Sequence, residues 1–170
     1  MSAYMSDDGR FRYLLRRTWG PMGTPNDRAE MGFIMLNPST ADATLDDPTI
    51  RRCVGYAKRE GFGGLVVANL FAYRATSPKD LAAAGFPTGD PENQRAIGHV
   101  IETCPVVVAA WGAMSAPAVT RARRSALAIA GTKGRRLWCL STTASGAPGH
   151  PLYLPLDAPL VEWPVRGGAS

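Results

Sequence analysis

Apolar positions along the chain are gathered into short continuous runs that are separated by more polar stretches. The runs at residues 31–37, 65–73, 105–112 and 135–141 contain almost no polar positions. A strand with one wet face would alternate between apolar and polar residues, so these runs predict strands that are buried on both sides. Residues 11–19 alternate moderately and predict one further strand.

Helical segments are predicted between these runs, because three of them open on a short polar residue followed by proline. Asp47, Ser77 and Asp90 each precede a proline, and a side-chain oxygen at this position can cap the first turn while proline fits the first helical position. The predicted helices span residues 48–61, 77–85, 90–104 and 115–131. Residues 20–30 and most of the chain after residue 141 are predicted to be loop, with a strand near the end.

Strands that alternate with helices predict an α/β fold with a parallel sheet. We expect a three-layer α/β/α architecture with a mainly parallel four-stranded central sheet. The length of 170 residues suits one domain, which we place at residues 1–165, followed by a disordered tail at 166–170.

Ligands of such sheets bind beyond the carboxyl ends of the strands. Four segments leave those ends in this chain: 37–39, 69–74, 111–112 and 141–151. They bring two asparagines, an arginine, a tryptophan and a histidine toward the same edge. The order of the elements therefore predicts a ligand site there.

The formal net charge of +5 favours an anionic partner, and we expect DNA or a nucleotide. Basic residues gather at 12–17, 50–53, 121–124 and 133–136. Each of these clusters is equally compatible with a solvated surface.

The remaining composition narrows the class of protein. No apolar stretch reaches the roughly 20 residues that cross a bilayer, and the first residues lack an apolar signal core, so we expect a cytoplasmic protein without a membrane partner. Three widely spaced cysteines form no CxxC pair, and two histidines add no ligand cluster. We expect reduced thiols, no cofactor, no metal cluster and a monomer.

Four motifs in the chain resemble those of the uracil-DNA glycosylase superfamily, in the same order and over residues 31–155. They are "LNPSTAD", "VVANLFAYRATSP", "PENQRAIGHVIETCPVVVAAWGAMSAPAV" and "GHPLYL". Over nearly its whole length the chain also resembles the DUF1643 domain family of uncharacterised bacterial and phage proteins. The shared signatures there are Asn-Pro-Ser-Thr-Ala-Asp, Asp-Pro-Thr, Trp-Gly and Gly-x-Pro-x-His-Pro-Leu-Tyr.

The glycosylase resemblance implies a fold of that type and a DNA-repair hydrolase that cleaves an N-glycosidic bond. It assigns Asn37 to hold the attacking water, Asn69 to read the edge of the base, and His150 to stabilise the leaving base. An amide cannot act as a general base, so Asp42, Asp46 or Asp47 is expected to reach the water and supply basicity. Of these three, Asp42 is assigned as the catalytic residue.

The same resemblance, together with position at the strand ends, suggests further contacts. Substrate binding is assigned to the loop residues Pro38 and Ser39, to Phe71 or Tyr73 by stacking, to Arg74 through a phosphate, and to Trp111. DNA binding is assigned to Leu152 and Tyr153 as a wedge and to Arg51 and Arg52 in the basic cluster.

Structural explanations compete with several of these roles. Asn37 with Pro38 can be a turn that ends a strand, Asp47 a helix cap, Asn69 a structural hydrogen-bonding residue and Trp111 a core residue. His99 lies within a predicted helix and is expected to be a structural or a surface residue.

Departures from the glycosylase motifs keep other functions open. Leu152 stands where that superfamily has a serine that grips a phosphate, and the Arg-Pro-Pro signature and iron–sulfur cysteines are absent. The alternatives are a DNA- or nucleotide-binding module that has lost hydrolysis, and an enzyme that processes small nucleosides or nucleotides. A nucleotide-handling transferase on the same scaffold is a weaker option.

Overall fold

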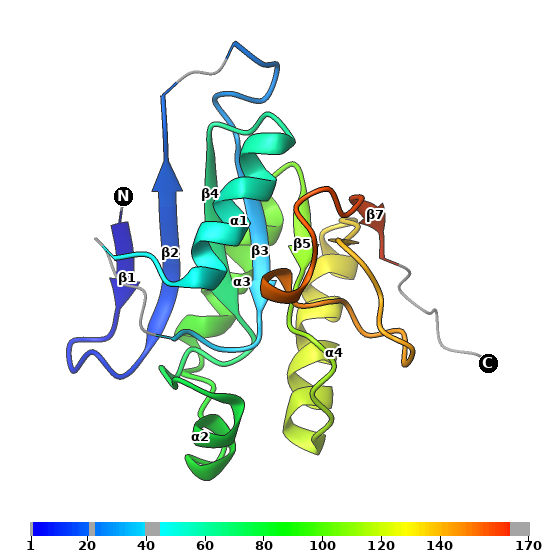
Figure 1. Ribbon diagram of the computed structural model, residues 1–170. Helices are drawn as coiled ribbons and strands as arrows, with labels where there is room; N and C mark the ends of the chain where they lie inside the picture. The colour runs from blue at the N-terminus through cyan, green and yellow to red at the C-terminus, as the bar shows by residue number, and fades with distance from the viewer. Residues whose placement is uncertain (1, 21–22, 40–44, 164–170) are drawn as a thin grey trace.

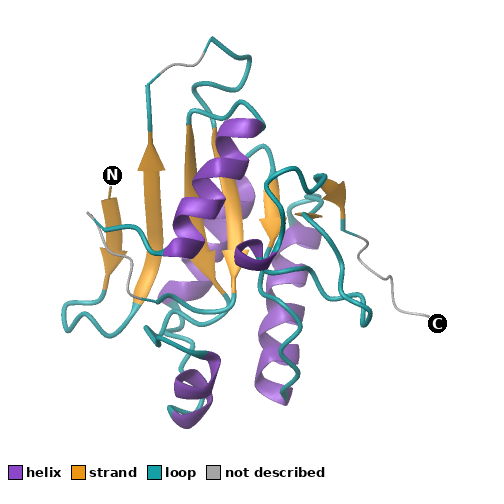
Figure 2. Cartoon of the chain, in the orientation of Figure 1, coloured by secondary structure: helices purple, strands orange, loops and turns teal. Residues whose placement is uncertain are grey.

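A computed structural model describes residues 2–20, 23–39 and 45–163, and in this part a single mixed sheet carries helices on both faces (Figures 1 and 2). The sheet has seven strands in the order β1-β2-β4-β3-β5-β6-β7. The strands are β1 (Ser2–Met5), β2 (Arg12–Thr18), β3 (Glu30–Met35), β4 (Gly64–Asn69), β5 (Val107–Ala109), β6 (Trp138–Cys139) and β7 (Val161–Glu162). The helices are α1 (Pro48–Arg59), α2 (Pro78–Ala83), α3 (Glu92–Thr103) and α4 (Pro117–Thr132), and a 3₁₀ turn, η1, spans Pro151–Tyr153.

The pairing of the strands corrects the expected four-stranded sheet. Strand β3 pairs in parallel with β4 and β5, and β5 pairs in parallel with β6. Antiparallel pairs of β1 with β2, β2 with β4, and β6 with β7 extend the sheet at both edges. The sheet is therefore mixed and has seven strands. The tail predicted at residues 166–170 lies outside the described residues.

Two hydrophobic cores lie on opposite faces of the sheet. On β3, Phe33 belongs to the core under α1, and Ile34 belongs to the core under α3 and α4. This alternation follows from the two-residue period of a strand. Both positions are fully buried, which explains why the β3 sequence shows no polar face.

The starts of the helices follow the cap predictions in two of three cases. The Asp47 carboxylate accepts the backbone N–H of Ile50 at 2.8 Å, and Ser77 forms a capping box with Asp80. The cap predicted at Asp90 is wrong, because Pro91 takes the N-cap position of α3 and no side chain caps this helix.

No helix in the described part of the chain combines the length and apolar character needed to cross a membrane.

Candidate functional site

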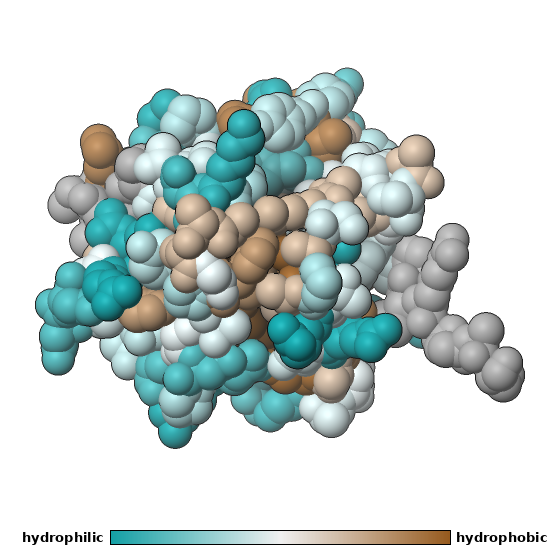
Figure 3. Space-filling view, turned by 90° about the horizontal axis from the view of Figure 1, so that it is seen from below, coloured by the Kyte–Doolittle hydropathy of each residue, from teal (hydrophilic) through white to brown (hydrophobic). Residues whose placement is uncertain are grey.

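A cavity of about 550 Å³ opens at the carboxyl ends of the parallel strands. It is lined by the ends of β3, β4 and β5, by the start of α1 and by η1. Figure 3 shows this end of the molecule, where apolar surface at the centre is surrounded by hydrophilic residues. The volume lies within the range of pockets that hold small organic ligands.

Asn37 follows β3 and lines the cavity with its side chain half-buried. Its amide nitrogen donates to the carbonyl oxygens of Pro38, at 3.0 Å, and Ala75, at 2.8 Å. Both partners are carbonyl oxygens, which can only accept a hydrogen bond. The amide atom that faces them is therefore the nitrogen and not the oxygen. The oxygen is the atom left to meet a ligand, so Asn37 offers the cavity a hydrogen-bond acceptor.

Asn69 is the last residue of β4 and lines the same cavity with only 1% of its surface exposed. Within the described residues, neither its amide nitrogen nor its amide oxygen has a hydrogen-bond partner. A buried polar atom without a partner costs roughly 1–3 kcal/mol, so such an atom in a residue of a pocket wall is a candidate to pair with a ligand. The amide presents one donor and one acceptor side by side.

A second asparagine holds the end of β4 in place. Asn93 of α3 is fully buried, and its amide nitrogen donates to the main-chain oxygens of Asn69, at 3.0 Å, and Leu70, at 3.2 Å. Leu70, the residue that follows β4, is also hydrogen-bonded to β3, since its N–H donates to the Met35 oxygen. The backbone that carries the Asn69 amide is therefore fixed from two sides.

His150 reaches the cavity from the N-cap position of η1. Its Nδ1 accepts the backbone N–H of Leu152 at 3.3 Å, so the neutral ring carries its proton on Nε2. Burial lowers the pKa of His150, and the nearby Asp47 carboxylate acts in the opposite direction. A neutral imidazole with a free Nε2–H is a hydrogen-bond donor at neutral pH.

Asp47 lines the cavity, but its carboxylate already has two partners. One oxygen accepts the Ile50 N–H, and the other accepts the Ser39 hydroxyl. Ser39 is itself a cavity residue, so this bond fixes its hydroxyl against the cap of α1. Asp42, the residue expected to supply basicity, lies outside the described residues.

Trp111 and Gly112 form the wall that follows β5. Trp111 is 1% exposed, lies edge-on to Trp163 with ring centroids 5.2 Å apart, and has no described partner for its indole N–H. Gly112 has a φ of +76°, and a Cβ placed there would be 3.8 Å from the Cβ of His150. The positive φ turns the chain toward η1, so the β5 and η1 walls of the cavity meet at this glycine.

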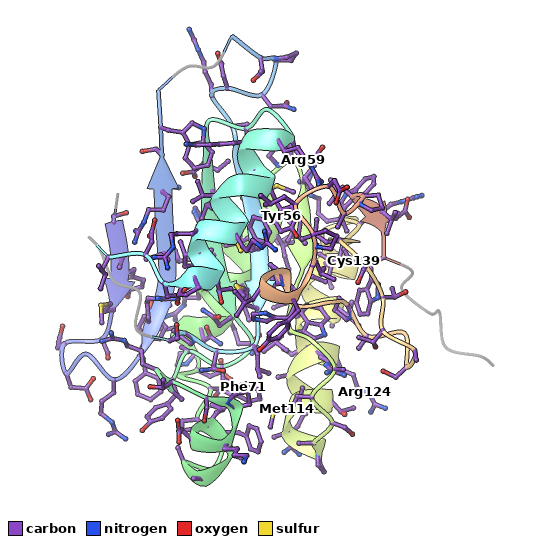
Figure 4. The ribbon with its side chains drawn as sticks, viewed as in Figure 1. Tyr56, Arg59, Phe71, Met114, Arg124 and Cys139 are labelled. Carbon is purple, nitrogen blue, oxygen red and sulfur yellow. The ribbon has the colours of Figure 1, made fainter. Side chains whose placement is uncertain are left out.

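Arg123 of α4 holds the loop after Gly112. Its guanidinium donates to the carbonyl oxygens of Gly112, at 3.1 Å, and Met114, at 2.7 Å. Burial lowers the pKa of Arg123. Figure 4 shows Met114 between the lower part of α4 and the Phe71 segment.

A family model described as a protein of unknown function, DUF1643, matches residues 12–152. The chain belongs to the DUF1643 family. The match begins at Arg12 and ends at Leu152, and both residues line the cavity. No curated protein and no solved structure matches the chain. In this DUF1643 protein, the described residues contain no group of three or more histidine, cysteine, aspartate or glutamate side chains that could hold a metal ion.

Four residues assigned to substrate binding have other contacts in this DUF1643 chain. Phe71 is buried in the core and packs against Phe86 at 5.4 Å between ring centroids. Tyr73 packs edge-on against Phe11 at 5.9 Å between ring centroids, and Arg74 donates to the Gly9 oxygen at 3.3 Å. Pro38 is buried, and its oxygen accepts the N–H of Ala75. None of the four lines the described cavity.

The two arginines assigned to DNA also have partners within the protein. Arg51 donates to the main-chain oxygen of Asp46 at 2.6 Å, and Arg52 donates to that of Leu154 at 2.7 Å. The Tyr56 hydroxyl contacts the oxygens of Leu154 and Pro155, at 3.1 and 2.8 Å. Figure 4 shows Tyr56 and Arg59 on the side of α1 that faces this segment. Arg52 therefore helps to anchor η1 and the residues after it.

Leu152 and Tyr153 of η1 lie at the mouth of the cavity. Leu152 is partly buried, whereas Tyr153 is 81% exposed and lies 5.4 Å from the His150 ring, measured between centroids. An exposed aromatic side chain beside a pocket is available for contact with a ligand that extends beyond it.

Sequence reasoning missed two buried polar residues of the site. Arg12, at the start of β2, lines the cavity although it is only 2% exposed. Asn93 supports Asn69 from α3. The signal for Asn93 was a polar residue in the first turn of an amphipathic helix, and the signal for Arg12 was a charge at the start of a moderately alternating strand.

Proposed function

We propose that this DUF1643 protein binds a nucleobase in the cavity and hydrolyses the N-glycosidic bond of a uracil-like or modified base in DNA, as the resemblance to uracil-DNA glycosylases implies. The observation that carries the proposal is the Asn69 amide, whose donor and acceptor are both buried in the cavity wall without a described partner. One amide can pair with a donor and an acceptor that lie side by side on a heterocycle.

The chemistry of bond cleavage gives His150 and Asn37 separate tasks. The base departs as an anion, and a donor that is already in place stabilises the developing charge. The neutral His150 ring supports this role, because Nε2–H is its donating atom. The Asn37 oxygen can accept a hydrogen bond from the water that attacks the sugar, since its nitrogen is committed to two carbonyls.

Oligonucleotides that contain uracil, a mismatch or a modified base test the proposal. The protein should release the base and leave an abasic site that alkali cleaves, and gel electrophoresis of the treated strand measures the product. The variants Asn69→Leu and His150→Asn should each reduce the product by 100-fold or more. His150→Asn retains a side-chain acceptor for the Leu152 N–H, so a loss of activity in this variant would report on the imidazole donor.

His99→Asn is the matched control, because His99 lines a separate small pocket beside β1 and β2. It should cleave at the wild-type rate. If every oligonucleotide stays intact while free nucleosides lose their base, the substrate is a small molecule. If neither class of substrate is cleaved, the hydrolase proposal fails.

A second candidate is a binding module that recognises a base without cleaving it. It is favoured by the state of Asp47, the one carboxylate among the described residues of the cavity wall, whose two oxygens are both engaged. A carboxylate held in this way is poorly placed to take a proton from water. Tight binding of a base or oligonucleotide without product formation would identify this function.

A further inference from the structure

The indole N–H of Trp111 is the second unsatisfied donor in the cavity wall. Trp111 is 1% exposed, and its Nε1 has no hydrogen-bond partner among the described residues. Two less buried tryptophans have partners: Trp19 donates to the Phe62 oxygen at 2.8 Å, and Trp163 donates to the Gly146 oxygen at 3.2 Å. The most deeply buried of these three indoles is therefore the one that lacks an acceptor.

The position of Trp111 relates it to Asn69 across β3. Asn69 pairs with Met35 of β3, and Ala109 pairs with Ile34. Trp111 is two residues after Ala109, so along the strand direction it lies one residue further than Asn69. Strands β4 and β5 flank β3, and their backbones lie roughly 9–10 Å apart, because neighbouring strands are about 4.8 Å apart.

The two side chains also start from opposite faces of the sheet. Trp111 belongs to the core that contains Ala109, whereas Asn69 has the strand parity of Val67 in the other core. Both line the one cavity beyond the strand ends. A flat ring in this cavity can therefore contact side chains that come from both faces of the sheet.

We propose that Trp111 is a specificity-determining residue whose indole N–H donates a hydrogen bond to the heterocycle that Asn69 binds. This inference rests on the proposed function, because it takes the ligand to be a nucleobase. An indole is a donor only, so the ligand must present a carbonyl oxygen or an unprotonated ring nitrogen at a second edge. A base with an amino group at that edge would place two donors against each other and be rejected.

The variant Trp111→Phe tests the inference, because it keeps an aromatic ring against Trp163 and removes the N–H. Free uracil, thymine, hypoxanthine, cytosine and adenine are titrated into the wild-type protein and the variant by calorimetry. The base that binds the wild type most tightly should bind the variant at least tenfold more weakly. The free variant should unfold at a urea concentration close to that of the wild type, since removal of a buried unpaired donor offsets the loss of part of a buried ring.

Trp19→Phe is the matched control, because its N–H is paired and it lies outside the cavity wall. It should lose stability and keep the affinity for the base. A second test uses an analogue of the bound base in which one carbonyl is replaced by C–H. Loss of the acceptor that faces Trp111 should weaken binding to the wild type and leave binding to Trp111→Phe unchanged.

The outcomes separate this inference from the proposed function. Equal affinities of wild type and Trp111→Phe for a base would overturn the role of Trp111 and leave base binding intact. If no base binds the wild type, the proposed function fails and the inference fails with it.

Discussion

The amide nitrogen of Asn93 lies 3.0 Å from the main-chain oxygen of Asn69, so the asparagine in the cavity wall is held from behind by a second asparagine. The same nitrogen reaches the oxygen of Leu70. One side chain on α3 therefore satisfies two carbonyls at the point where β4 stops pairing.

Removal of this contact should destabilise the fold. Asn93→Leu keeps the approximate side-chain volume but leaves two carbonyls buried without their donor, and we expect a loss of about 1–3 kcal/mol in the free energy of unfolding. Urea denaturation followed by circular dichroism measures it. Arg95→Ala, two residues further along and on the exposed side of α3, breaks a surface ion pair with Glu92 and should cost less than about 1 kcal/mol. Equal effects of the two changes would contradict a stabilising role of the Asn93 hydrogen bonds.

The ion pair between Arg17 and Asp46 should contribute to stability more than the exposed pairs do. Arg17 is 2% exposed at its side chain, and its Nε lies 2.7 Å from the Asp46 carboxylate. Asp46→Ala takes this carboxylate away from a buried guanidinium, and we expect a loss of about 3 kcal/mol in thermal or urea unfolding. The half-exposed pair of Arg16 with Glu30 provides the comparison, since Glu30→Ala should cost less than about 1 kcal/mol. A small loss in Asp46→Ala would show that other contacts satisfy Arg17.

The lowered pKa of His150 should make stability depend on pH. In the unfolded chain the imidazole titrates near 6.5, and burial lowers its pKa in the folded chain. The unfolded state then binds more protons below neutrality, so the contribution of His150 is present above pH 6.5 and is lost as the pH falls toward the folded-state pKa. Urea unfolding at a series of pH values from 7.5 to 5 should therefore show a steeper loss for the wild type than for His150→Asn. Parallel pH profiles would rule out this assignment.

The Tyr56 hydroxyl should keep the η1 side of the cavity closed to solvent. It contacts the oxygens of Leu154 and Pro155, and Tyr56→Phe removes both contacts while keeping the ring. We expect a loss of about 1 kcal/mol and faster amide exchange in peptides that cover residues 150–158, measured by mass spectrometry. Lys58→Ala, an exposed change on α1 beside Trp19, should leave the exchange of this segment unchanged. Unchanged exchange in Tyr56→Phe would mean that Arg52 and Arg59, which donate to main-chain oxygens of the same segment, are sufficient to anchor it.

The central strands and the start of α1 were predictable because their signals are local. A continuous apolar run specifies burial on both faces, and Asp47 followed by Pro48 specifies a cap wherever the rest of the chain lies. The meeting of four strand exits at one cavity also follows from element order alone. The predicted edge of the sheet is the place where Asn37, Asn69 and His150 lie.

The remaining features depend on distant partners that a linear pattern does not reveal. Residues of β1 alternate between exposed and partly buried positions. The strand forms because Ser2 to Met5 pair with β2. Strand β6 is shorter than its apolar run, since regular pairing involves only Trp138 and Cys139. Arg52 resembles a DNA contact in a basic cluster, but its acceptor is the oxygen of Leu154, far along the chain.

The cavity wall begins with Arg12 near the start of the chain and ends with Leu154 near its close. A ribosome-bound polypeptide that has not yet released residue 154 cannot complete this wall, so capture of a ligand must follow synthesis of every segment from residue 12 to residue 154. A bound molecule would then favour the finished fold over every truncated or partly assembled form.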